Sequence, residues 1–227
     1  MDAALIVGAG EGLSASLARR FAAEGRRVVL AARNTDKLAA LCAETRATAI
    51  ACDTSDPASV AALFSQATQP GPLDVVVFNA SARVRGPVAE IDPSEVQRAL
   101  MVSAFGGFLV GQQAAIHMLK RNAGTILFTG ASASVKGYPQ SASFAMGKFA
   151  LRGLAQSMAR ELQPQGIHVA HIVIDGGIRS ASRIVPADKP DSLLDPDAIA
   201  ETYLQLIAQH RSAWSWEIEV RPWVERF

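Results

Sequence analysis

The sequence has little cysteine and almost no excess charge of either sign. Among its 227 residues are two cysteines, Cys42 and Cys52, without the spacing of a disulfide framework or a metal site, so both thiols are expected to be reduced. Lys and Arg together number 22 and Asp and Glu 21, which leaves a net charge of +1. Since no charged patch is evident, we expect no nucleic-acid partner and a small-molecule substrate instead.

An export leader and a membrane span are also missing from the pattern. The first residues form neither a basic segment nor an apolar segment of signal-peptide length, so a cytoplasmic location is expected. Gly, Arg or Asp interrupts the apolar runs before they reach the roughly 18 residues of a span, which predicts no membrane contact. His117, His168 and His171 have no metal-ligand spacing, so no metal is expected.

What is present is an alternation of short Val, Ile and Leu runs with stretches of helical periodicity, which is typical of βαβ units. Strands are expected at residues 3–8, 27–32, 47–52, 73–78, 124–130, 167–174 and 214–220. Helices are expected at residues 12–24, 35–44, 57–66, 93–121, 141–162 and 196–210. The pattern predicts one doubly wound, Rossmann-type α/β domain over residues 1–227, with a seven-stranded parallel sheet of order 3-2-1-4-5-6-7.

Two regions of this domain are expected to face a ligand or a partner. Residues 180–195, with two prolines and mixed charge, form the one long loop and are expected to cover a substrate. The helices near residues 97–119 and 144–162 are apolar nearly all round, which indicates cover on both sides. A homodimer or homotetramer through these helices is expected, with burial deep in the sheet core as the alternative.

A glycine-rich turn joins the first strand to the first helix. Gly8, Gly10 and Gly12 alternate along it, and glycine lets the backbone approach a pyrophosphate at a helix N-terminus. A tight turn alone explains one glycine but not three. The turn therefore predicts a dinucleotide site that includes Gly8, Gly10, Glu11, Gly12 and Leu13.

The second strand ends at Arg33 and Asn34, where a dinucleotide fold meets the adenosine ribose. A carboxylate there would bind the ribose hydroxyls and repel a 2′-phosphate, whereas Arg33 would pair with that phosphate. NADP is therefore preferred, with NAD possible. An exposed arginine without a ligand is the alternative.

Four segments, in order along the chain, resemble motifs of the short-chain dehydrogenase/reductase family, and the resemblance extends over nearly the whole chain. Residues 8–14 are similar to TGxxxGxG, residues 78–81 to NNAG and residues 175–180 to PGxxxT, and residues 52–56 resemble the segment that holds adenine. The resemblance implies that further residues bind the cofactor: Asp53, Thr54, Asn79, Ala80, Ser81, Gly176 and Ile178.

At the active site the family's YxxxK is matched by Phe144 and Lys148, so the lysine is kept and the tyrosine is not. In the family the phenol exchanges a proton with the substrate, while the lysine lowers the pKa of that phenol and binds the nicotinamide ribose. A phenyl ring has no proton to exchange. The family's serine falls at Ala131, with Ser132 beside it as a substitute, and the asparagine of its fourth helix falls at Ser103.

The leading hypothesis is an NADP(H)-dependent oxidoreductase with a relocated proton donor, acting on a small carbonyl or alcohol or on a conjugated enone. Dienoyl-CoA reductases, related by fold, similarly keep the lysine without tyrosine at the usual place. The candidate donors are hydroxyls expected near Lys148: Tyr138, Ser132, Ser134, Ser141 and Ser143. Tyr138 is preferred because the resemblance puts it in the pocket wall, although it could simply pack before Pro139.

Asp175 is a further candidate beside the expected nicotinamide site. Burial there would raise the pKa of its carboxyl and suit it to acid or base work, while the alternative is a hydrogen bond to the following turn. The three altered catalytic positions also permit a second hypothesis, a catalytically silent dinucleotide-binding regulator or partner subunit. A third is a fold that has lost the cofactor altogether.

Overall fold

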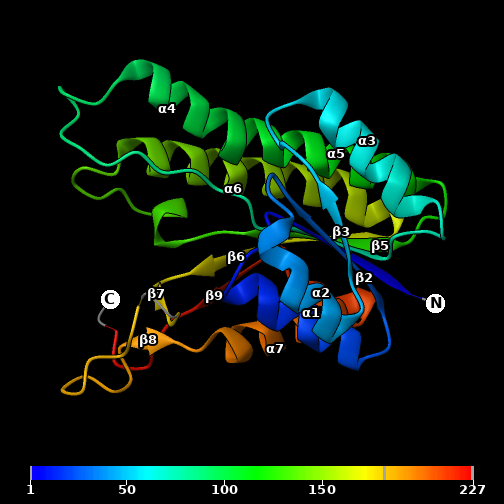
Figure 1. Cartoon of the computed structure of the whole chain (residues 1–227). Coiled ribbons are helices and arrows are strands. Elements are labelled where there is room, and N and C mark those ends of the chain that lie inside the picture. The colour runs from blue at the N-terminus through cyan, green and yellow to red at the C-terminus, as the bar shows by residue number, and fades with distance from the viewer. Residues whose placement is uncertain (1, 181–182, 226–227) are drawn as a thin grey trace.

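A seven-stranded parallel sheet forms the centre of the computed structural model, which describes residues 2–180 and 183–225 (Figure 1). Its order, β3-β2-β1-β4-β5-β6-β9, confirms the predicted fold class and strand order, with β9 as the seventh predicted strand. The strands are β1 (Ala3–Val7), β2 (Arg27–Ala32), β3 (Thr48–Ala51), β4 (Val75–Phe78), β5 (Gly124–Thr129), β6 (Ile167–Ile174) and β9 (Glu217–Val220). Every residue of β1, β4 and β6 is buried, as expected of strands covered on both faces.

Helices cover the two faces of the sheet in separate layers (Figure 1). One layer holds α3 (Pro57–Thr68), α4 (Pro93–Leu100), α5 (Gly106–Leu119) and α6 (Ala142–Leu162), and the other holds α1 (Leu13–Ala23), α2 (Ala39–Thr45) and α7 (Pro196–Ile207). Asp56, Asp92 and Asp195 start α3, α4 and α7, since each carboxylate accepts a backbone N–H of its helix and proline follows at once. These Asp-Pro pairs explain why the starts of these helices were predictable.

The predicted helix at residues 93–121 is interrupted. A π-helical turn, Met101–Phe105, separates α4 from α5, and there Ser103 Oγ accepts a hydrogen bond from the Ala82 backbone N–H at 2.9 Å. Such turns insert one extra residue and are common at functional sites. Through this turn, the side chain of Ser103 binds the backbone of the loop that follows β4.

The same segment corrects the expectation that every apolar run is too short for a membrane. By length and composition alone, the helix Pro93–Leu119 could cross one, although 44% of its apolar window is buried inside this fold. Its buried residues, Val110, Ala114 and Met118 among them, belong to the core that packs on the sheet. The segment packs here as a core helix.

Two predicted boundaries near the C-terminus differ from the structure. Within the expected loop at 180–195, Leu193–Leu194 forms strand β8 and pairs with β7, Gly177–Ile178, while residues 181–182 lie outside the described part of the chain. The last strand begins at Glu217 instead of residue 214, because Trp214 stacks on the buried His168 ring with 4.9 Å between centroids. The indole therefore packs before the strand starts.

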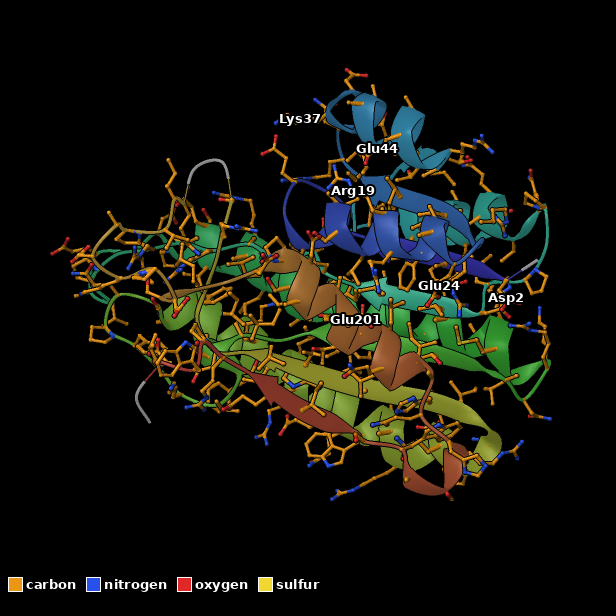
Figure 2. All side chains as sticks on the ribbon, turned by 90° about the horizontal axis from the view of Figure 1, so that it is seen from below. Asp2, Arg19, Glu24, Lys37, Glu44 and Glu201 are labelled. Atoms are coloured by element: carbon orange, nitrogen blue, oxygen red, sulfur yellow. The ribbon has the colours of Figure 1, made fainter. Side chains whose placement is uncertain are left out.

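The outer surfaces of the two helical layers differ in chemistry. On the α1, α2 and α7 side, Arg19 pairs with Glu44 at 2.7 Å and Arg20 with Glu201, and Figure 2 shows Arg19 and Glu44 on neighbouring helices. The outer side of α5 and α6 exposes large apolar side chains: Phe108, Ile116, Met146 and Phe149. The layer of α1, α2 and α7 therefore carries ion pairs on its outer surface, whereas α5 and α6 expose apolar side chains.

Candidate active site

The turn after β1 has the backbone geometry that only glycine adopts readily. Gly8 and Gly12 have φ angles of 84° and 75°, and a Cβ at Gly8 would lie 2.3 Å from the Ala80 backbone nitrogen. Gly10 is different, since a Cβ there would meet nothing within 4 Å. Gly8 and Gly12 are required by the fold itself, while Gly10 leaves open space above the turn.

A cavity of about 350 Å³ lies beside this turn, at the carboxyl ends of β1, β2 and β4. The predicted cofactor residues that line it are Gly8, Arg33, Asn34, Thr54, Asn79, Ala80 and Ser81. Lys37, which the sequence analysis did not select, also lines it and adds a second cation beside Arg33. Lys37 could have been selected from the sequence as a second basic residue four positions after Arg33. In the structure it belongs to a short 3-10 helix, Asp36–Leu38.

The other residues predicted to bind the dinucleotide near the glycine turn, together with Asp53, do not line this cavity. Gly10, Glu11 and Gly12 belong to the turn itself, and Leu13 is buried at the start of α1. The Asp53 carboxylate accepts hydrogen bonds from the Ser55 N–H and hydroxyl, which lower the pKa of Asp53. An ionised Asp53 therefore lies next to Thr54, which does line the cavity.

Ser14 stands where the family motif has its last glycine, and its hydroxyl is fully used. Asn79 Nδ2 donates to Ser14 Oγ at 2.7 Å, and Ser14 Oγ donates to the Gly8 carbonyl at 3.3 Å. The two bonds fasten the end of β4 to the glycine turn. The departure from the motif thus supplies a tie within the site.

A second cavity, of about 390 Å³, lies at the carboxyl ends of β5 and β6. Asn79 and Ser81 line both cavities, so the two are adjacent parts of one site. Gly176 and Ile178, predicted to bind the cofactor, line the second one, as do Ala131, Ser132, Tyr138, Phe144 and Lys148. The structure therefore brings most of the predicted catalytic residues together.

Lys148 is buried at the base of the second cavity, with 3% of its surface exposed. Its ammonium donates to the Thr129 carbonyl at 2.7 Å, and burial lowers the pKa of Lys148 to about 8. The Phe144 ring, one helical turn earlier on α6, lies 5.8 Å from Nζ. The lysine is thus poised to hold or release a proton near neutral pH, beside a ring that cannot.

Of the five hydroxyl side chains predicted near Lys148, two line the second cavity. Ser134 Oγ accepts a hydrogen bond from the Ala131 N–H, and Ser141 Oγ accepts one from the Arg83 guanidinium. Ser143 Oγ accepts a hydrogen bond from the Val84 N–H and donates one to the Val84 carbonyl. All three serines are buried and absent from the lining of the second cavity. Ser132 and Tyr138 do line the cavity, and Tyr138 is 45% exposed.

The prediction that burial raises the pKa of Asp175 was wrong. Burial acts in that direction, but hydrogen bonds from Ser132 and Lys136 and the charges of Lys136 and Arg221 outweigh it, so the pKa is lowered. Lys136 Nζ and Arg221 Nη2 lie 3.1 and 3.3 Å from Oδ2 of Asp175. Asp175 is therefore an ionised anchor that joins the loop after β5 to the segment after β9.

A buried histidine and the ion pair that it contacts lie beneath the second cavity. The His171 ring is fully buried, its Nδ1 lies 3.0 Å from a Glu217 oxygen, and burial lowers the pKa of His171 to about 4. Arg152 pairs with the same carboxylate at 2.6 Å. Nε2 of His171 packs against Gly130, so the end of β5 rests on a neutral imidazole.

Together, the doubly wound sheet and the paired cavities at the carboxyl ends of its strands define a protein of the dinucleotide-fold class. The family model for short chain dehydrogenases matches residues 2–184, and the chain belongs to that family of oxidoreductases. A hydroxynaphthalene reductase-like protein of Metarhizium acridum is 32% identical over 82% of this chain and 74% of its own. An uncharacterized oxidoreductase of Staphylococcus aureus is 28% identical over 96% of both chains.

Solved structures agree with this assignment. A short-chain dehydrogenase from Rhodopseudomonas palustris superposes with a TM-score of 0.86 at 37% identity, covering 98% of this chain and 99% of its own. A metagenomic short-chain oxidoreductase in complex with NADP gives the same TM-score at 27% identity, covering 99% and 98%. The fold is that of these two structures, and the superposition includes nearly all of each chain.

Proposed function

We propose that this oxidoreductase binds NADP(H) across the two cavities and uses a relocated proton donor on a small carbonyl or alcohol or on a conjugated enone. The observation behind the proposal is the shared lining. Because Asn79 and Ser81 border both cavities, a single extended ligand would reach from Arg33 to Lys148. The metagenomic relative that is crystallised with NADP supports the same choice of cofactor.

The preference for NADP rests on the two cations at the far end of the first cavity. Arg33 and Lys37 both line it, and a 2′-phosphate would be paired by them, whereas no acidic side chain is present among its described lining residues to bind free ribose hydroxyls. The glycine turn and the N-terminus of α1 suit the pyrophosphate. The residues present therefore fit the group.

The bound cofactor supplies a hydride, so the chain itself must hold the substrate and move one proton. Lys148 would bind the nicotinamide ribose, as the family resemblance implies, from a position fixed by the Thr129 carbonyl. Tyr138 would donate the proton, because it is the one phenol among the described cavity-lining residues and Lys136 lies within hydrogen-bonding reach of it. Ser132, held by Asp175, would orient the substrate oxygen.

Assembly and location stay predictions of the same proposal. The exposed side chains Phe108, Ile116, Met146 and Phe149 support a homodimer or homotetramer through α5 and α6. A cytoplasmic location follows from the sequence pattern alone.

The experiment titrates the purified protein with NADPH and with NADH and then follows NADPH oxidation with a panel of aldehydes, ketones and enones. NADPH should bind more tightly than NADH, and at least one compound should be reduced. In the Tyr138→Phe variant, NADPH should bind as before while turnover falls by roughly a hundredfold or more. Unchanged turnover would remove Tyr138 as the donor, and binding without any turnover would favour a silent dinucleotide-binding protein.

A further inference from the structure

The second cavity is lined by cations that the proposed hydride chemistry does not use. Arg83 and Arg183 line it together with Lys148, and none of its described lining residues is Asp or Glu. The nearby carboxylate of Asp175 already pairs with Lys136 and Arg221. The cavity therefore presents an excess of positive charge to whatever enters it.

Arg83 is held in place by the start of α6. Its Nη2 donates to Ser141 Oγ at 2.9 Å, and its guanidinium carbon lies 4.9 Å from the centre of the Phe144 ring. The adjoining Val84 is clamped by Ser143 Oγ, which accepts the Val84 N–H at 3.1 Å and donates to its carbonyl at 2.9 Å. A long side chain fixed in this way loses little further entropy when it binds a ligand.

Phe144 thereby acquires a definite role at the position where the family has tyrosine. A phenyl face attracts a guanidinium, and arginine stacked on a ring still presents its edge N–H groups to an anion. The side chain that cannot donate a proton instead supports the cation at the cavity wall.

Arg183 contributes a second guanidinium to the cavity lining. Its side chain packs against Gly177, where an added Cβ would lie 3.3 Å from Cδ of Arg183, and its backbone bonds to Ser180 in both directions. Burial, followed by the charges of Arg85 and Arg183, lowers the pKa of Arg83. The arginines thus repel one another, a cost that a bound anion would relieve.

We propose that the second cavity selects substrates that carry a carboxylate in addition to the reducible carbonyl or enone, with Arg83 and Arg183 binding the carboxylate and Phe144 supporting Arg83. This deepens the proposed function and rests on it for the reaction. Bidentate pairing of guanidinium with carboxylate supplies both affinity and orientation. The reacting group is then placed between Tyr138 and Lys148.

The test uses protein saturated with NADPH and a matched pair of probes, 4-oxo-4-phenylbutanoate and its methyl ester. Binding is followed by the change in NADPH fluorescence, and turnover by loss of NADPH absorbance. The acid should bind, or be reduced, at least about tenfold better than the ester, and added salt should narrow the difference. Equal binding of the two probes to NADPH-loaded protein would overturn the inference and leave the proposed function standing.

Variants assign the preference to particular residues. In Arg83→Gln the preference for the acid should fall by about tenfold with little change for the ester, and in Phe144→Leu by about threefold. The matched control is Arg85→Gln, which alters a neighbouring exposed arginine outside the cavity lining and should keep the full preference. A loss as large in Arg85→Gln as in Arg83→Gln would make the effect one of general surface charge and overturn the assignment.

Two further measurements separate this inference from the proposed function. The NADPH dissociation constant should be unchanged in Arg83→Gln, and a large increase would mean that Arg83 holds the cofactor instead. If wild-type protein binds no NADPH, the proposed function fails. The acid should then still raise the melting temperature of the cofactor-free protein more than the ester does, and equal shifts would overturn the inference as well.

Discussion

The first cavity, beside the glycine turn, and the second cavity, around Lys148, are formed by neighbouring strands of one sheet, but they are specified by different parts of the chain. Around residues 8–14 the backbone decides the geometry, through positive φ angles and a close approach to Ala80. Around residues 129–148 and at Asp175 the side chains determine the geometry, because the serines, Lys148 and Asp175 each bond to groups within the protein. Backbone requirements leave a glycine pattern in a sequence, whereas side-chain partnerships leave no fixed spacing.

The comparison predicts its largest effect at Gly8. Gly8→Ala should lower the free energy of unfolding by about 3 kcal/mol or more, because the new Cβ meets the Ala80 backbone and the φ angle is positive. Chemical denaturation of the cofactor-free protein measures this. The matched control, Gly10→Ala, should leave stability within about 0.5 kcal/mol and weaken NADPH binding at least roughly tenfold. Equal destabilisation by both substitutions would show that the turn as a whole, not one close approach, sets the geometry.

His171, beneath the second cavity, should make the stability of the fold decrease as the pH falls. Burial holds its pKa at about 4 against 6.5 in an unfolded chain, so below pH 6.5 the unfolded state binds the proton first. The free energy of unfolding should fall by up to about 3 kcal/mol between pH 6.5 and 4. His171→Gln should flatten that decline when denaturation is measured across this range. A small decline should remain, since burial also lowers the pKa of His168.

Lys148 should show opposite effects on stability and on binding. Its pKa of about 8 lies below the 10.5 of an exposed lysine, so wild-type stability should rise between pH 8 and pH 10.5 and Lys148→Met should lack that rise. At neutral pH the free energy of unfolding of the variant should be about 2 kcal/mol higher than that of the wild type, and the variant should bind NADPH about tenfold more weakly. Denaturation and fluorescence titration measure the two effects. A variant that loses both stability and affinity would mean that the ammonium contributes mainly through the Thr129 carbonyl.

The smallest effect is expected at the ribose end. Arg33→Ala should reduce the preference for NADPH over NADH by about tenfold, and Lys37→Ala by less, because each removes one cation from an exposed phosphate site. Titration with both cofactors gives the ratio. NADPH affinity that falls no more than NADH affinity would contradict the assignment of Arg33 to the 2′-phosphate.

Much of the fold could be predicted because its signals are local. Apolar runs located the strands, the doubly wound fold type implied their order in the sheet, and Asp-Pro pairs marked the starts of three helices. The π turn at Met101–Phe105 was missed, since it depends on Ser103 reaching the Ala82 backbone, a contact between residues distant in sequence. Strands β7 and β8 were missed because two-residue pairs carry no periodicity.

In the candidate site, the sequence did not reveal which distant residues the polar side chains contact. Ser141 and Ser143 looked like free hydroxyls because nothing in the sequence places residues 83–84 against the start of α6. Asp175 looked like a buried acid because the approach of Lys136 and Arg221 depends on the whole sheet. Lys37 could have been found, since a cation four residues after Arg33 is visible in the sequence.

The two sides of helix α6 could link the activity of the protein to its own concentration. Its inner side places Lys148 in the site, while Met146 and Phe149, within two residues of it, point their exposed apolar surfaces outward. Whatever covers that outer side must also restrain the helix on which the buried ammonium is mounted. If a second copy of the chain covers it, dilution would loosen the helix that holds Lys148, and the specific activity of the enzyme would then depend on how much of it is assembled.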